Sequence, residues 1–170
     1  MKVLLFALLQ AAVAPDSLHF SEVLRATVQH VTYAGRQAVK LAPAPGDSML
    51  NDEMMALVAN TDLQDGTIEI DVAGAPLTGA SAGARGFIGI AFRVAPHAEH
   101  AEVMYIRPTN GRADDQLRRN HSTQYVSEPG FPWYKLRQDS PASTSPTWTC
   151  NPAPGRTYGW SSAAPPHASS

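Results

Sequence analysis

Residues 87–108 read FIGIAFRVAPHAEHAEVMYIRP, and this stretch has the pattern of two β-strands around a turn. Its first part, Phe87 to Val94, is apolar on both faces, which is typical of a central strand between two layers. The turn PHAEH follows, and AEVMYIRP then alternates, so that Tyr105 and Arg107 point to the side opposite Ile106. The pattern predicts two consecutive β-strands.

The flanking segments also have the residue patterns of β-strands. The segment TIEIDVA, residues 67–73, alternates strictly between apolar and polar and predicts a half-buried strand. Residues 19–33 and 36–41 predict strands around a turn at Tyr33–Arg36, and residues 54–58 are a short apolar run. No window of ten or more residues after Pro15 has helical periodicity. Short strands with Gly and Pro turns predict an all-β sandwich or barrel.

Composition sets limits on the class of protein. A chain of 170 residues with 44% apolar and 16% charged residues predicts one globular domain. The net charge of −2 gives no field that would recruit nucleic acid or an anionic membrane, so we expect no nucleic-acid partner. The single cysteine, Cys150, excludes a disulfide framework and metal sites built on paired cysteines.

Residues 1–14, MKVLLFALLQAAVA, predict a secretory signal peptide. Lys2 supplies the positive end, an apolar run follows, and Ala12-Val13-Ala14 fits a cleavage site, although Pro15 just beyond it disfavours cleavage there. The run is shorter than the roughly 20 residues of a membrane span, so we expect no stable span. A signal peptide at residues 1–14 predicts a secreted or periplasmic protein. The alternative is a buried N-terminal element of the domain.

The C-terminal segment, residues 138–170, differs from the rest of the chain. From Pro141 to Ser170 there is no Leu, Ile, Val, Phe, Met, Asp, Glu or Lys. Such a composition predicts a disordered tail, either a linker or an O-glycosylated segment. The codons for Thr147 to Asn151, shifted by one nucleotide, spell alternating apolar and polar residues. We therefore favour a frameshifted tail, which leaves a partial domain at residues 17–137 that is incomplete at its C-terminus.

Four segments together resemble a known family: GTIEIDVAG, ARGFIGIAFRV, AEVMYIRPTNGRADDQLRRNHSTQY and FPWYKLR. They resemble bacterial exported proteins of the concanavalin A-like lectin/glucanase superfamily. Within it they are similar to laminin-G-like domains and to the group labelled 3-keto-disaccharide hydrolase, over about Ser17 to Arg137. The resemblance implies a two-sheet jelly roll whose concave face commonly meets carbohydrate.

We therefore expect an exported carbohydrate-binding, laminin-G-like module without catalytic activity, whose partner is a carbohydrate or a glycosylated surface. One alternative is a glycoside hydrolase of the same superfamily with catalytic acids partly in a missing C-terminal half. Glu69 and Asp71 share a strand face, as in the family-16 glycosidase motif, but Gly74 stands where the second glutamate is needed, so no catalytic residue is assigned. Another alternative is a truncated, non-functional product.

The segment RPTNGRADDQLRRNHSTQY, residues 107–125, is the candidate ligand loop because it combines planar polar side chains with nearby aromatic residues in the sequence. The candidate ligand-binding residues are Tyr105, Arg107, Asn110, Arg112, Asp114, Asp115, His121 and Trp133.

Two other interpretations of this loop stay open. Asn110, Asp114 and Asp115 are oxygen donors suited to calcium, but neighbouring arginines oppose a cation, so we expect no metal and no cofactor. Alternatively, the loop is a solvated surface in which arginines pair with Asp114 and Asp115. His97 and His100 lie in a predicted turn, and we expect them at the surface.

Overall fold

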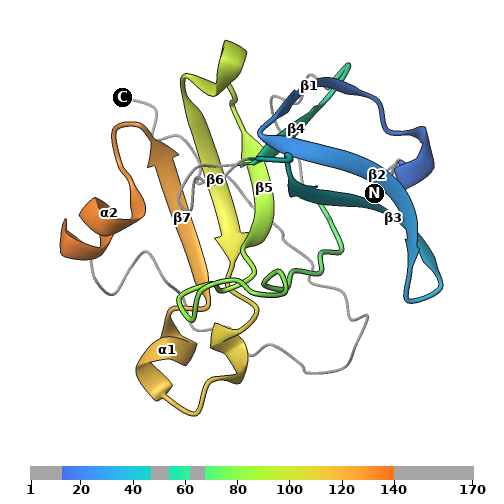
Figure 1. The fold of residues 1–170 in the computed structure, drawn as a ribbon. Coiled ribbons are helices and arrows are strands. Elements are labelled where there is room, and N and C mark those ends of the chain that lie inside the picture. Colours follow the sequence, from blue (N-terminus) through green and yellow to red (C-terminus); the bar gives the residue numbers. More distant parts are fainter. Residues whose placement is uncertain (1–12, 47–53, 62–67, 140–170) are drawn as a thin grey trace, which may run out of the picture. The chain divides into compact units, whose positions relative to one another are not determined.

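The computed structural model describes residues 13–46, 54–61 and 68–139. Over these residues the fold is rich in strands, with seven β-strands in three small antiparallel sheets and two short α-helices (Figure 1). Most of the predicted signal peptide and almost all of the predicted tail lie outside the described residues. No helix in these three ranges is long and apolar enough to cross a membrane.

The chain divides into two compact units, and the first comprises Met1–Thr61. In it, β1 (Phe20–Leu24) pairs with β4 (Met55–Val58), and β2 (Ala26–Tyr33) pairs with β3 (Arg36–Pro43). The β2–β3 hairpin turns at Ala34 and Gly35, which both have positive φ, 49° and 77°. Two such residues match the twist of the flanking strands, and they confirm the predicted turn. A 3-10 helix, η1 (Pro15–Ser17), precedes β1.

The second unit, Asp62–Ser170, contains a three-stranded antiparallel sheet in the order β5-β6-β7. The strands are β5 (Ile88–Phe92), β6 (Ala101–Ile106) and β7 (Thr123–Glu128), so the two strands predicted from residues 87–108 are confirmed. The 3-10 helix η2 (Pro96–Ala98) lies between β5 and β6.

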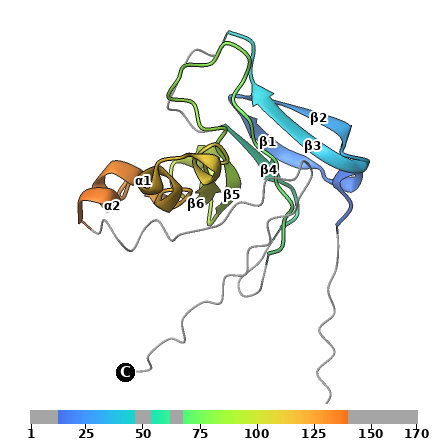
Figure 2. The same ribbon diagram turned by 90° about the horizontal axis from the view of Figure 1, so that it is seen from below.

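Two helical segments join β6 to β7. They are η3 (Asn110–Arg112) and α1 (Gln116–Asn120), and α1 lies at the end of the sheet where β6 ends (Figure 1). The helix α2 (Trp133–Asp139) follows β7 and lies on the side of β7 away from β6 (Figures 1 and 2). Neither α-helix was predicted, because five and seven residues are too few to show a 3.6-residue period.

The prediction of a strand at residues 67–73 is wrong for its described part. Residues 68–76 form no strand, although the alternation of exposure survives, with Val72 buried and Glu69 and Asp71 exposed. A β-carbon at Gly74 would clash with the carbonyl oxygen of Gly86, so the segment runs close beside the start of β5 without a ladder. Alternation fixes which side chains face inward, but a strand also needs hydrogen-bonded partners.

The expectation that Phe87–Val94 forms a doubly covered central strand is also wrong. Among the described strands β6 is central, while β5 lies at the edge and all of its residues are only half-buried. Gly89 allows this pairing to be close, because a β-carbon there would clash with the backbone of Met104 and Tyr105. Over the described ranges the buried apolar residues are Met55, Val72, Ala101, Ile106 and Val126.

Candidate functional site at the end of the β5–β7 sheet

The candidate site lies where β6 ends and β7 begins. Antiparallel pairing continues one step beyond the strands, since the backbone N–H of Arg107 donates to the carbonyl of Ser122 at 2.7 Å. The next carbonyl, that of His121, therefore lies beside the Arg107 side chain. Residues 108–121 form the connecting loop, with η3 and α1 at this end of the sheet (Figure 1).

Arg107 is buried, with 6% of its surface exposed. Its guanidinium donates to the His121 carbonyl at 3.1 Å, to the Tyr105 hydroxyl at 3.1 Å and to Gln124 Oε1 at 3.5 Å. All three acceptors are neutral. Burial lowers the pKa of Arg107 below its ordinary value, yet an arginine stays charged at neutral pH. A desolvated cation thus lies at this end of the sheet.

Two aromatic rings flank that cation. The Arg107 Cζ atom lies 5.0 Å from the ring centroid of Tyr105 and 5.7 Å from that of Phe87. The two rings meet edge to face, with centroids 5.6 Å apart and planes at 81°. A cation over an aromatic face is stabilised by the ring quadrupole. Phe87 remains 56% exposed, so part of its ring faces solvent beside the buried polar groups.

Asn110 completes the polar part of the site. Its side chain is 5% exposed, and its Nδ2 donates to the same His121 carbonyl at 3.0 Å. Its backbone N–H donates to the Arg107 carbonyl at 2.9 Å. Oδ1 of Asn110 is buried and has no hydrogen-bond partner among the described residues. Burying an acceptor without a donor costs about 1–3 kcal/mol, so this oxygen is an unsatisfied polar atom of the site.

The structure does not bring every candidate residue to this cluster. Asp115 is exposed and caps α1, since its Oδ1 accepts from the Leu117 N–H at 2.8 Å. Asp114 is also exposed, and the side chain of Arg112, at the end of η3, is outside the description. His121 contributes its carbonyl, whereas its ring Nδ1 lies 2.7 Å from the Leu117 carbonyl.

The interpretation as a solvated loop of ion pairs fails for Arg119. Its guanidinium donates to the backbone carbonyls of Ala113 and Asp114 and to the side chain of Gln116. These bonds order the loop without using the carboxylates of Asp114 and Asp115. For the calcium interpretation, no group of three or more His, Cys, Asp or Glu residues suited to a metal occurs in the part of the chain that the structure describes.

Trp133 is the first residue of α2 and is 46% exposed. The Arg137 Cζ atom lies 5.1 Å from its ring centroid, and the Tyr134 ring meets it edge to face at 5.9 Å. One helical turn separates Trp133 from Arg137, so both side chains lie on one side of α2. Trp133 therefore belongs to an arginine–aromatic pair of its own.

Sequence reasoning missed Phe87 and Gln124. Phe87 could have been found, because Ile88 pairs with Ile106 and the next antiparallel step places Phe87 beside Arg107. Gln124 pairs with Tyr105 in the ladder and is fully buried.

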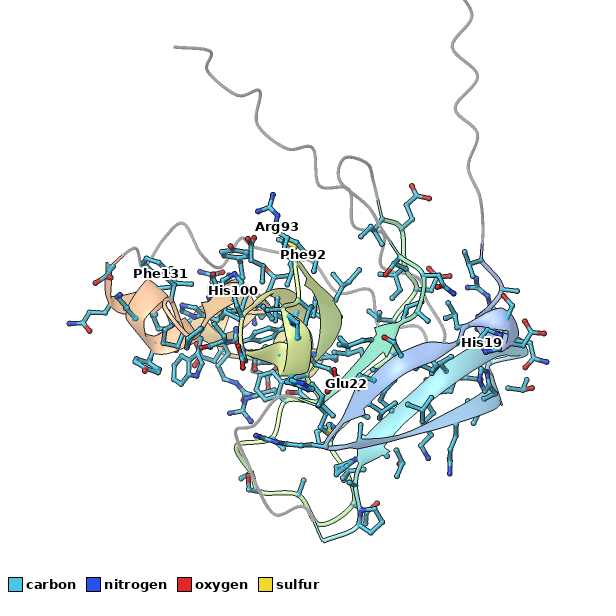
Figure 3. All side chains as sticks on the ribbon, turned by 90° about the horizontal axis from the view of Figure 1, so that it is seen from above. His19, Glu22, Phe92, Arg93, His100 and Phe131 are labelled. Atoms are coloured by element: carbon cyan, nitrogen blue, oxygen red, sulfur yellow. The ribbon has the colours of Figure 1, made fainter. Side chains whose placement is uncertain are left out.

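A second polar network lies near the opposite end of the sheet. Arg93 donates to Glu102 at 2.9 Å, and the Tyr125 hydroxyl donates to the other Glu102 oxygen at 3.0 Å. Burial raises the pKa of Glu102, but these hydrogen bonds outweigh it and hold that pKa below its ordinary value. Arg93 points outward and His100 is nearby (Figure 3). His97 and His100 are exposed, as predicted.

The chain was compared with known proteins at the level of family, sequence and structure. It matches no family model, no curated protein and no solved structure.

Proposed function

We propose that the chain is an exported carbohydrate-binding module of the laminin-G-like, jelly-roll type, without catalytic activity of its own. The saccharide binds at the end of the β5–β7 sheet. The observation that carries the proposal is the arrangement of Arg107 against the rings of Tyr105 and Phe87, beside the unpartnered Oδ1 of Asn110. Aromatic surface next to a few fixed polar groups is the usual composition of a small-ligand site.

Each part of the arrangement has a role in this proposal. The exposed ring of Phe87 packs against the apolar face of a sugar ring. The edge-to-face contact with Tyr105 holds the Phe87 ring in place. In the proposed complex Asn110 Oδ1 accepts a hydrogen bond from a sugar hydroxyl. Arg107 is locked by its hydrogen bonds to Tyr105 and His121, so its orientation costs little additional entropy on binding.

Binding by the full chain to an array of oligosaccharides tests the proposal, followed by titration with the best ligand. Phe87→Ala should weaken binding by about tenfold or more, which corresponds to about 1.4 kcal/mol. Phe131→Ala is the matched control, because Phe131 is another half-exposed phenylalanine that lies outside the cluster. Absence of binding to any saccharide, or equal losses in both variants, contradicts the proposal. Release of reducing sugar would replace it with the glycoside hydrolase alternative.

A further inference from the structure

A second arginine orders the loop that joins β6 to β7. Arg119 is half-buried on α1, and its guanidinium donates to the backbone carbonyls of Ala113 and Asp114, at 2.6 and 2.7 Å. A third hydrogen bond, at 2.5 Å, goes to Oε1 of Gln116. A guanidinium presents five N–H donors in a planar fork, so one side chain can hold all three acceptors. Arg119 therefore ties the chain before α1 to the last turn of α1.

The first of these carbonyls connects Arg119 to Asn110. Ala113 follows η3, and its backbone N–H donates to the Asn110 carbonyl at 3.1 Å, which closes the turn of η3. The carbonyl of Ala113 then accepts from the guanidinium of Arg119. The guanidinium therefore holds the end of the short helix that begins at Asn110.

The backbone of Arg119 fixes the other side of the candidate site. Its carbonyl accepts from the backbone N–H of Ser122 at 3.2 Å. In a trans peptide the carbonyl points away from the N–H that follows it, so this bond sets the direction of the His121 carbonyl. That carbonyl is the acceptor shared by Arg107 and Asn110.

We propose that Arg119 is a positioning residue of the candidate site. Because it joins η3 to α1, it holds the Asn110 amide 3.0 Å from the His121 carbonyl and keeps the buried Oδ1 of Asn110 in place. A site that is already ordered loses less entropy when a ligand binds. The expected effect on saccharide binding rests on the proposed function, whereas the expected effect on Asn110 does not.

The test compares Arg119→Gln with the unmodified full chain in two measurements. The first is the hydrogen-exchange rate of the Asn110 side-chain amide, followed by NMR. This rate should rise at least about fivefold, because the hydrogen bond to His121 opens more often, and the rise should exceed that of the β6–β7 ladder amides. The second is a titration with the best oligosaccharide of the array, whose affinity should fall about fivefold.

Arg118→Gln is the matched control, because Arg118 is the neighbouring, exposed arginine of α1 and its substitution removes the same charge. Its exchange rate at Asn110 and its affinity should equal those of the unmodified chain. Arg119→Lys keeps the charge and can reach a carbonyl, but it loses the fork. It should therefore give values between those of Arg119→Gln and the unmodified chain.

Three results overturn this inference and leave the proposed function standing. They are an unchanged exchange rate at Asn110 in Arg119→Gln, a rise that is equal throughout the β6–β7 ladder, and equal effects of Arg119→Gln and Arg118→Gln. Faster exchange at Asn110 without a loss of saccharide affinity also overturns it. If the unmodified chain binds no saccharide, the proposed function fails, and the exchange rates alone decide whether Arg119 positions Asn110.

Discussion

Arg107 and Asn110 donate to one acceptor, the carbonyl oxygen of His121, at 3.1 and 3.0 Å. The shared carbonyl fixes the guanidinium and the amide side by side, although His121 lies fourteen positions after Arg107 in the sequence. Both donors are buried, so their geometry changes little with the motions of exposed side chains. The candidate site is therefore organised from the end of a β-ladder, and the loop supplies the His121 carbonyl as its anchor.

The close approach of β5 and β6 predicts that Gly89→Ala is destabilising. Its new β-carbon would clash with the carbonyl of Met104 and the backbone of Tyr105, which cannot move without breaking the ladder. We expect a loss of about 2 kcal/mol or more in the free energy of unfolding, measured by urea denaturation. Gly130→Ala is the control, because a β-carbon there meets nothing within 4 Å. A change in Gly89→Ala no larger than in the control contradicts the pairing.

The cap on α1 predicts different results for two adjacent aspartates. Asp115→Ala removes the acceptor of the Leu117 N–H and should cost about 1 kcal/mol, whereas Asp115→Asn should cost much less. Amide hydrogen exchange at Leu117 reports this loss directly. Asp114→Ala removes an exposed neighbouring carboxylate and should leave that exchange rate unchanged. Faster exchange in both variants to the same extent argues against the cap.

Two glutamates of the β6–β7 pair should titrate on opposite sides of the ordinary value of 4.5. Hydrogen bonds from Arg93 and Tyr125 outweigh burial and lower the pKa of Glu102, while burial raises the pKa of Glu128. NMR titration of the two carboxyl groups measures both values. If the pKa of Glu102 is higher than that of Glu128, the hydrogen bonds from Arg93 and Tyr125 to Glu102 are not formed as described.

The directions of these two pKa shifts determine how the free energy of unfolding depends on pH. Because the folded pKa of Glu102 is lowered, its stabilisation is present above the unfolded value and is lost as pH falls through the folded pKa. For Glu128 the folded pKa is raised, so its contribution increases as pH falls through that pKa. Glu102→Gln should therefore reduce the loss of stability between about pH 5 and pH 3 in urea denaturation. An unchanged pH profile in Glu102→Gln contradicts this assignment.

The binding proposal also predicts that the chain melts cooperatively. A site built from buried side chains at the end of a β-ladder requires that ladder to be formed. Circular dichroism should show a single transition whose midpoint rises with a bound saccharide. A featureless melt favours the alternative of a truncated product that does not fold stably.

The sequence predicted the strands of the β5–β6 pair well, because Phe87–Ile106 carries strong apolar patterning around a turn. It predicted the positions of Tyr105 and Arg107 on one face for the same reason. It could not show that residues 68–76 lack a partner strand, since pairing is a long-range property. The roles of Asp115 and Asn110 also escaped it, because capping and burial depend on the local path of the loop.

The proposed function requires a saccharide to bind at the end of the β5–β7 sheet, against Phe87 and the buried Arg107–Asn110 pair. The most direct measurement is an NMR titration of the full chain with its best oligosaccharide ligand, with backbone amide shifts followed residue by residue. We expect shift changes concentrated at residues 85–89, 105–110 and 121–124, which Phe87→Ala abolishes and Phe131→Ala preserves. Shift changes confined to other parts of the chain, or none at saturating ligand, would contradict it.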